Sequence, residues 1–136
     1  MELRNNRTGK RVERETVVEA GPEEVWEALT DEDRLSEWIA PEVELDPVEG
    51  GELLVRGDGD ERRGTVETVT DGERFAFTWE RPGEGESLVE FTVEAIPEGT
   101  RVVVVETAIS GPTALASADW APPLTRLRRS LSLAFA

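Results

Sequence analysis

The stretch DGERFAFTWERPGEG, residues 71–85, places three aromatic side chains, Phe75, Phe77 and Trp79, at alternate positions. Side chains two residues apart on a β-strand project from the same face, so this spacing predicts a strand with one strongly apolar face. Asp71-Gly72, just before the aromatics, is a strong signal for a tight β-hairpin. We therefore expect an antiparallel sheet whose aromatic face is covered by another layer.

Strand-like periodicity continues on both sides of this stretch. The predicted strands are 11–20, 42–46, 52–56, 62–70, 73–80, 87–96 and 100–109. The later ones are joined by short turns, such as Pro97-Glu98-Gly99, and short turns imply antiparallel neighbours. Strand 87–96 alternates, with Val89, Phe91 and Val93 on one side, which is typical of a sheet with one apolar face and one wet face.

Helical periodicity appears in three places. PEEVWEALT (22–30) begins with a proline and two glutamates, which suit the first turn of a helix. DEDRLSEWI (31–39) predicts a second short helix that ends before Pro41, because the residue before a proline avoids the helical region. A terminal helix from Pro122 carries leucines and a phenylalanine at spacings of three and four. These residues are Leu124, Leu127, Leu131 and Phe135.

The order of elements predicts an α+β fold: a strand, two short helices, six antiparallel strands and a long C-terminal helix. The leucine stripe of that helix is the segment able to cover the aromatic face of the sheet. We expect a basic N-terminal tail at 1–10, followed by a single domain at 11–136, because 136 residues suffice for one sizeable core.

Composition narrows the function classes. The net charge is −15, and outside the basic terminal segments it is more negative still, which disfavours nucleic-acid binding. The sequence has no cysteine, no apolar run long enough to span a bilayer and no signal peptide at its start. We therefore expect a cytoplasmic protein with no membrane span and no disulfides.

Several motifs in order carry a resemblance to a known family. They are Ser36-Glu37-Trp38-Ile39-Ala40-Pro41, Gly50-Gly51, Gly64-Thr65-Val66, Arg74 to Trp79, Thr100-Arg101-Val102, and Asp119-Trp120 before the leucine-spaced helix. Over about residues 12–133 the chain resembles the SRPBCC (START-like) superfamily. More narrowly, it resembles bacterial proteins related to the C-terminal domain of the heat-shock-protein-90 ATPase activator.

This resemblance implies a helix-grip fold, in which a curved antiparallel sheet of about seven strands wraps around the terminal helix. Members of the superfamily often hold a ligand cavity between sheet and helix, and they include lipid-transfer domains, hormone-binding proteins, polyketide cyclases and the chaperone activator. The chain departs from the family at 113–118, which is short and plain, and in the two prolines that open the last helix.

The catalytic inventory argues against most enzymes. The chain has no histidine, cysteine or tyrosine, and its one lysine lies in the N-terminal tail, so no familiar triad can form. A carboxylate pair would need burial, and most glutamates fall at positions predicted to face water. Glu106, in VVVVETAI, is the nearest exception, and we interpret it as an edge or outer-face residue. We predict no catalytic residue and no cofactor.

One acidic stretch could be mistaken for a metal site. In GDGDERRG (57–64), Asp58, Asp60 and Glu61 could offer oxygen ligands to calcium or magnesium. The acids and the bidentate glutamate of an EF-hand loop are missing at their fixed positions. The segment is better explained as a polar hairpin turn with glycines at positive φ, so we predict no metal site.

The tryptophans leave two interpretations open. Trp38 and Trp120 either fix the two ends of an ordinary core or border the opening of a pocket with an aromatic floor. Polar groups on the inner face are few, chiefly indole N–H groups and hydroxyls such as Thr107, so a ligand would be largely apolar. The candidate cavity residues are Trp26, Trp38, Phe75, Phe77, Trp79, Phe91, Trp120, Leu124 and Leu127.

Three functions follow from these observations. The first is non-catalytic binding of a small hydrophobic molecule between sheet and helix. The second, implied by the resemblance, is a protein-interaction module like the co-chaperone that activates a stress-response ATPase. A cyclase-like enzyme is a remote third, for which the sequence offers no catalytic residue. We expect a monomer or a weak dimer, with a small hydrophobic molecule or a protein as partner.

Overall fold

The computed structural model describes residues 11–57, 59–83, 85–110 and 119–132. The expected basic tail at 1–10, the plain segment at 113–118, Asp58 and Phe135 lie outside the described residues.

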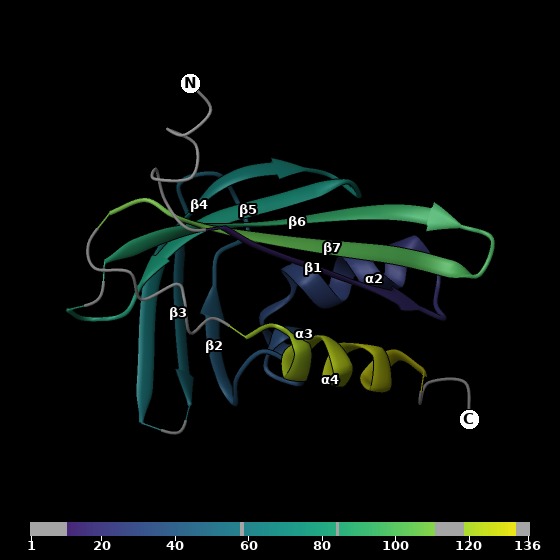
Figure 1. Cartoon of the computed structure of the whole chain (residues 1–136), viewed down its shortest axis with the longest axis horizontal. Coiled ribbons are helices and arrows are strands. Elements are labelled where there is room, and N and C mark those ends of the chain that lie inside the picture. The colour runs from purple at the N-terminus through teal and green to yellow at the C-terminus, as the bar shows by residue number, and fades with distance from the viewer. Residues whose placement is uncertain (1–10, 58, 84, 111–118, 133–136) are drawn as a thin grey trace.

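Seven strands form one antiparallel sheet (Figure 1). They are β1 (Arg11–Val18), β2 (Glu42–Leu45), β3 (Glu52–Gly57), β4 (Asp60–Thr70), β5 (Arg74–Glu80), β6 (Glu86–Ile96) and β7 (Gly99–Ala108). Their order in space is β1-β7-β6-β5-β4-β3-β2. The strands from β2 to β7 form a meander of hairpins, and β1 pairs with β7 at the far edge. The predicted α+β class and the antiparallel sheet are confirmed.

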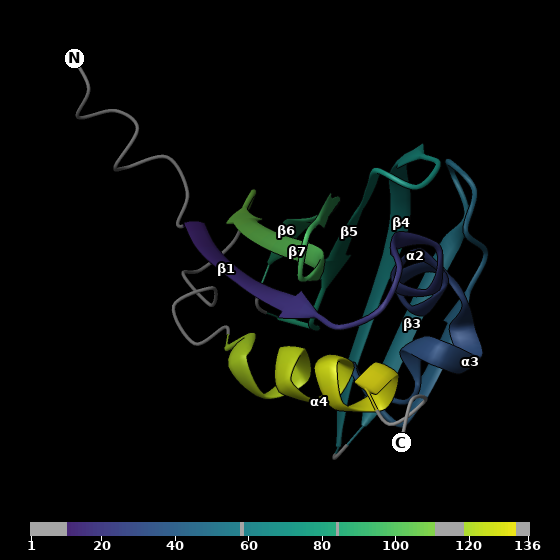
Figure 2. The same cartoon turned by 90° about the vertical axis from the view of Figure 1, so that its right-hand side faces the viewer.

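The sheet is strongly curved, and its concave side holds the helices α2 (Pro22–Thr30), α3 (Glu32–Leu35) and α4 (Ala121–Ser132) (Figure 2). Part of the bend comes from β4, whose register with β5 shifts between Val66 and Thr68. An extra residue in one strand bends it and increases its twist. Helix α4 contacts β1, while α2 contacts β6 and β7. The helix-grip arrangement expected from the family resemblance is therefore present.

Helix α3 is shorter than the predicted helix at 31–39. Its α-helical residues end at Leu35, and residues 36–39 continue as a tight turn. The amides of Glu37 and Trp38 donate to carbonyls three residues back, at 3.0 and 3.1 Å, so the last turn tightens toward 3₁₀ geometry. The tightening is local, because the amide of Ile39 still donates to the carbonyl of Leu35, four residues back, at 2.9 Å.

The core lies between the concave face of the sheet and the helices. Phe75, Phe77 and Trp79 are at most 5% exposed, so the predicted aromatic face is buried. Phe91, on the neighbouring strand β6, packs against Phe77 with 6.1 Å between ring centroids. The leucines of α4 belong to the same buried cluster: Leu124, Leu127 and Leu131.

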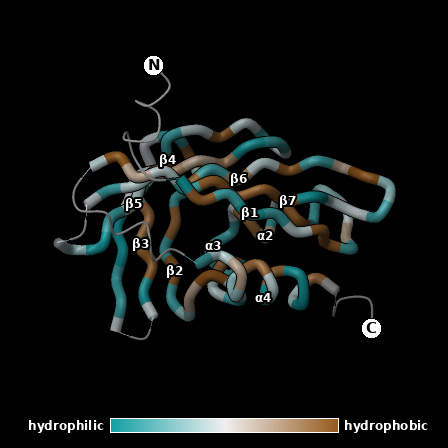
Figure 3. Tube along the Cα trace, viewed as in Figure 1, coloured by the Kyte–Doolittle hydropathy of each residue, from teal (hydrophilic) through white to brown (hydrophobic). Residues whose placement is uncertain are grey.

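Polar and apolar residues alternate along most strands and along α4 (Figure 3). This is the pattern expected when one face is buried and the other is wet. Among the described residues, no helix is long and apolar enough to cross a membrane.

Candidate ligand-binding pocket

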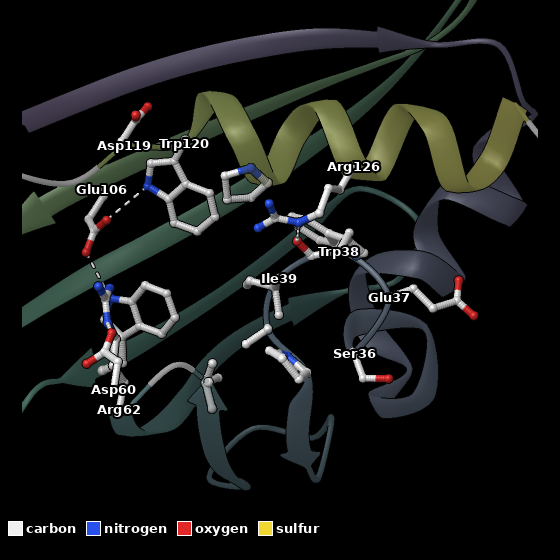
Figure 4. Close-up of a pocket in the computed structure, with 16 residues that line it drawn as sticks. Ser36, Glu37, Trp38, Ile39, Asp60, Arg62, Glu106, Asp119, Trp120 and Arg126 are labelled. Carbon is white, nitrogen blue, oxygen red and sulfur yellow. Dashed lines mark hydrogen bonds and ion pairs between the residues drawn. The ribbon is translucent and has the colours of Figure 1, made fainter.

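A pocket of about 620 Å³ opens where the 36–41 turn, strands β3, β4, β5 and β7, and the start of α4 meet (Figure 4). Its walls combine three indoles and several aliphatic side chains with a few charged groups. The lining residues are Ser36, Glu37, Trp38, Ile39, Ala40, Pro41, Val55, Gly57, Asp60, Arg62, Trp79, Glu106, Asp119, Trp120, Pro123 and Arg126.

The carboxylate of Glu106 is held at this pocket by three neutral donors. The indole N–H of Trp79 donates to Oε2 at 2.8 Å, and that of Trp120 donates to Oε1 at 3.0 Å. The hydroxyl of Ser87 also donates to Oε2. Glu106 is 3% exposed, so these bonds replace the water that an ionised carboxylate loses on burial. The donors come from β5, β6 and the residue before α4, which the fold brings together around β7.

Our interpretation of Glu106 as an edge or outer-face residue is wrong, and β7 lies inside the sheet between β1 and β6. On β7, Val102, Val104 and Glu106 share the buried face, opposite Val93, Phe91 and Val89 of β6. Thr107 is therefore on the other face and contributes no hydroxyl to the interior. The register of the β6–β7 hairpin could have revealed the position of Glu106. Ile96 pairs with Gly99 at the turn, and pairing the residues outward from there places Glu106 opposite the buried Val89. The run of four valines hid the alternation of the strand.

A second charged group lies against the same aromatic surface. The guanidinium carbon of Arg62 is 4.5 Å from the centroid of the Trp79 ring, within range of a cation–π interaction. The Asp60 carboxylate forms ion pairs with Arg62, at 3.5 Å, and with Arg81, at 2.9 Å. Trp79 also stacks on Trp120, with 5.9 Å between the ring centroids and an interplanar angle of 12°.

Trp38 and Arg126 fix the opposite wall. The Trp38 indole donates to the carbonyl oxygen of Ala28 at 2.9 Å, which ties the 36–41 turn to α2. The Nε of Arg126 donates to the backbone carbonyl of Trp38, also at 2.9 Å, which ties this turn to α4. The rest of the Arg126 side chain is exposed at the mouth of the pocket (Figure 4).

The structure divides the nine candidate cavity residues into two groups. Trp38, Trp79 and Trp120 line the pocket. The other six lie in or beside the packed core, and Trp26 contacts the edge of Phe75 at 6.4 Å between centroids. These six are Trp26, Phe75, Phe77, Phe91, Leu124 and Leu127. The aromatic interior is thus filled at its centre and open at the end where the tryptophans gather.

Glu106, Arg62 and Arg126 were not among the candidate cavity residues. Arg62 lies in the stretch that we interpreted as a turn and at the start of the predicted strand 62–70. Its position over the Trp79 ring depends on the β4–β5 pairing, in which Gly64 is opposite Trp79. Arg126 lies on α4 between Leu124 and Leu127 but off the leucine stripe, where charged residues are usually solvated. No local pattern in the sequence identifies either arginine as a lining residue.

The acidic stretch at 57–64 lies where β3 and β4 meet: Gly57 pairs with Asp60, Gly59 has a φ of +78°, and residues 60–64 belong to β4. Glu61 hydrogen-bonds to Arg56 and Arg63, and these bonds lower the pKa of its carboxyl. Within the described part of the chain, no group of three or more acidic residues is arranged to hold a metal ion.

Comparisons with known proteins agree with this architecture. The family described as Activator of Hsp90 ATPase homolog 1-like protein matches residues 19–131. The protein MLL2253 from Mesorhizobium loti superposes with a TM-score of 0.80 at 22% identity, over 91% of this chain and 98% of that one. The Aha1 dimer from Colwellia psychrerythraea superposes with a TM-score of 0.76 at 19% identity, over 93% and 99%.

DynU16, a putative protein in the dynemicin biosynthetic locus, is 29% identical and has a TM-score of 0.80. The match covers 91% of this chain but 48% of DynU16. No curated protein matches the sequence. The family match extends over most of the chain, and the solved structures reproduce its sheet and helices. The chain therefore belongs to the Activator of Hsp90 ATPase homolog 1-like family.

Proposed function

We propose that this chain is a non-catalytic binding protein for a small, largely apolar molecule, which it takes up in the pocket between the sheet and α4. The observation that carries the proposal is the convergence of Trp38, Trp79 and Trp120 on a space of about 620 Å³. Small-molecule sites are typically concave, of this size, and lined by aromatic groups with a few polar groups that orient the ligand. Trp38, Trp79 and Trp120 are the proposed contact residues.

The test is a titration of the purified protein with a panel of hydrophobic compounds, followed by tryptophan fluorescence and by thermal unfolding. A ligand that binds only the folded state raises the melting temperature, and one that sits between the indoles also changes their emission. We expect at least one compound to do both in a saturable way.

A matched pair of variants locates the binding. Ala40 lines the pocket, whereas Ala95 is exposed on β6 outside it. Ala40→Phe should fill part of the space and weaken binding at least about tenfold, since overfilled sites force neighbours to shift. Ala95→Phe adds the same ring and should bind like the wild type. Equal binding by both variants would refute this location.

A second candidate is a protein-interaction module that activates an ATPase. The family description favours it, because that description names activators of the Hsp90 ATPase. The test is the ATPase rate of an Hsp90-type chaperone with and without this protein. Stimulation that persists in Ala40→Phe would assign the activity to the outer surface and separate it from the pocket.

A further inference from the structure

Glu106 is a buried carboxylate whose hydrogen-bond donors are all neutral. Its partners are two indole N–H groups and one hydroxyl. Within residues 11–57, 59–83, 85–110 and 119–132, no ion pair includes Glu106. Arg62, which lines the same pocket, pairs with Asp60 instead. The charge of Glu106 is thus held in place but is not neutralised by the described protein.

The carboxylate also retains acceptor capacity. A carboxylate offers about four acceptor positions on its two oxygens. Among the described residues, Oε2 accepts from Trp79 and Ser87, whereas Oε1 accepts from Trp120 alone. One acceptor position therefore remains on Oε1, on a side chain that lines the pocket. A ligand with an N–H group can occupy that position.

The surrounding surface suits a cation. The lining holds four acidic side chains, Glu37, Asp60, Glu106 and Asp119, against two arginines, one of which, Arg62, already lies over Trp79 at 4.5 Å. The net charge of −15 attracts cations and repels anions within about one Debye length of the protein.

Arg62 and Arg126 are the two cations of the pocket lining, and Arg62 pairs with Asp60 at 3.5 Å, so Arg126 is the one that most favours an anion. It is exposed at the mouth, and its Nε is already bonded to the Trp38 carbonyl. Water screens an exposed charge much more strongly than a buried one. Glu106, at 3% exposure, should therefore dominate the choice of charge inside the pocket.

We infer that the ligand of this pocket is an apolar or aromatic molecule that carries a protonated nitrogen, and that Glu106 Oε1 accepts a hydrogen bond from that nitrogen. The inference rests on the proposed ligand-binding function and names the chemical class of the ligand. Glu106 is then the residue that determines specificity.

Three probes of nearly the same shape test this inference by calorimetric titration at neutral pH: 1-naphthylmethylammonium, 1-naphthalenemethanol and 1-naphthoate. We expect the ammonium to bind about tenfold more tightly than the alcohol, because both can donate a hydrogen bond to Oε1 but only the ammonium brings an opposite charge to it. The carboxylate should bind most weakly, because it meets Glu106 with like charge.

Variants identify the group responsible. Glu106→Gln should remove the preference for the ammonium over the alcohol, while Glu44→Gln, which removes the same charge from the exposed face of β2, should keep it. Arg126→Gln should raise the affinity for the ammonium by up to about twofold, because it removes a like charge that water screens. Arg126 is exposed, so this variant tests the charge of the ligand even if Glu106→Gln does not fold.

The outcomes separate the two proposals. Tightest binding by 1-naphthoate, lost in Arg126→Gln, would overturn the inference and leave the ligand-binding function standing. Equal binding of the ammonium and the alcohol would overturn it in the same way. If no probe binds, and no compound of the wider hydrophobic panel binds either, the proposed function itself fails.

Discussion

Glu106 shows how a single polar residue can be held inside an apolar layer. Burying an ionised carboxylate costs several kcal/mol, even after the protein relaxes around it. Each hydrogen bond to a charged group contributes about 1.5–3 kcal/mol, so three donors together are of the same order as that cost. Trp79, Ser87 and Trp120 are therefore the groups that hold the carboxylate at the pocket.

Removal of one donor should be measurable. We expect Ser87→Ala to lower the free energy of unfolding by about 1.5–3 kcal/mol, because the Glu106 carboxylate loses a hydrogen bond without gaining water. Ser36→Ala is the control, because the Ser36 hydroxyl donates to the backbone carbonyl of Asp33 at an exposed site. Its loss should lower the free energy of unfolding by no more than about 0.5 kcal/mol. Urea denaturation measures both, and equal losses in the two variants would contradict this account.

The residue scale is also where sequence reasoning failed. Phe75, Phe77 and Trp79 were assigned to the buried face because their alternation is regular. Glu106 follows four consecutive valines, and a run of apolar residues carries no period from which to read a face. The face on which Glu106 lies depends on the register of β7 with β6. A shift of that register by one residue would place Glu106 on the other face.

At the scale of elements, the predicted helices and strands agree with the structure where particular residues, such as prolines and turn residues, mark their ends. Pro22 begins α2 as expected, and the strands from β2 to β7 lie within a few residues of their predicted limits. The exception is α3, whose apolar spacing at Leu35 and Trp38 suits either an α-helix or the tight turn that follows it. Apolar spacing alone does not distinguish these over so few residues.

Gly64 on β4 offers a test of how tightly two elements approach. A Cβ at this position would lie 1.7 Å from the carbonyl oxygen of Thr78 on β5, so one of the strands must move. We expect Gly64→Ala to lower the free energy of unfolding by about 2 kcal/mol or more, since it forces backbone apart in a packed sheet.

Gly21→Ala is the matched control for Gly64→Ala. Gly21 precedes α2 with an ordinary φ of −72°, and a Cβ added there would meet no atom within 4 Å. Its replacement should change stability by less than about 1 kcal/mol. Thermal unfolding of the two variants compares them directly, and similar melting temperatures would show that the sheet yields easily at Gly64.

At the scale of the whole molecule, the sequence indicated the layers but not the space between them. A curved sheet covered by a leucine-striped helix followed from periodicity and from the family resemblance. Whether the interior was filled or open depended on a few side chains, because interiors are close-packed and small volume changes matter. The structure fills the region around Phe77 and Phe91 and leaves the end near Trp38 and Trp120 open.

The overall charge gives a prediction at the same scale. Thirty acidic residues against fifteen basic ones repel one another in the folded chain. Raising NaCl from about 0.02 M to about 0.5 M shortens the screening length severalfold, so the melting temperature should rise by roughly 3–8 °C. KCl at the same concentration serves as the control, because screening does not depend on which monovalent cation is used. A fall in melting temperature would instead show that attractive ion pairs outweigh the repulsion.

The arrangement around Glu106 also constrains how this sequence can evolve. The carboxylate and its donors stand on β5, β6, β7 and the approach to α4, so no single substitution preserves the set. A lineage that replaces Glu106 by an apolar residue leaves two indole N–H groups without an acceptor, which favours later loss of Trp79 or Trp120. We expect these four positions to covary among homologues, and to change together when a lineage turns to a different ligand.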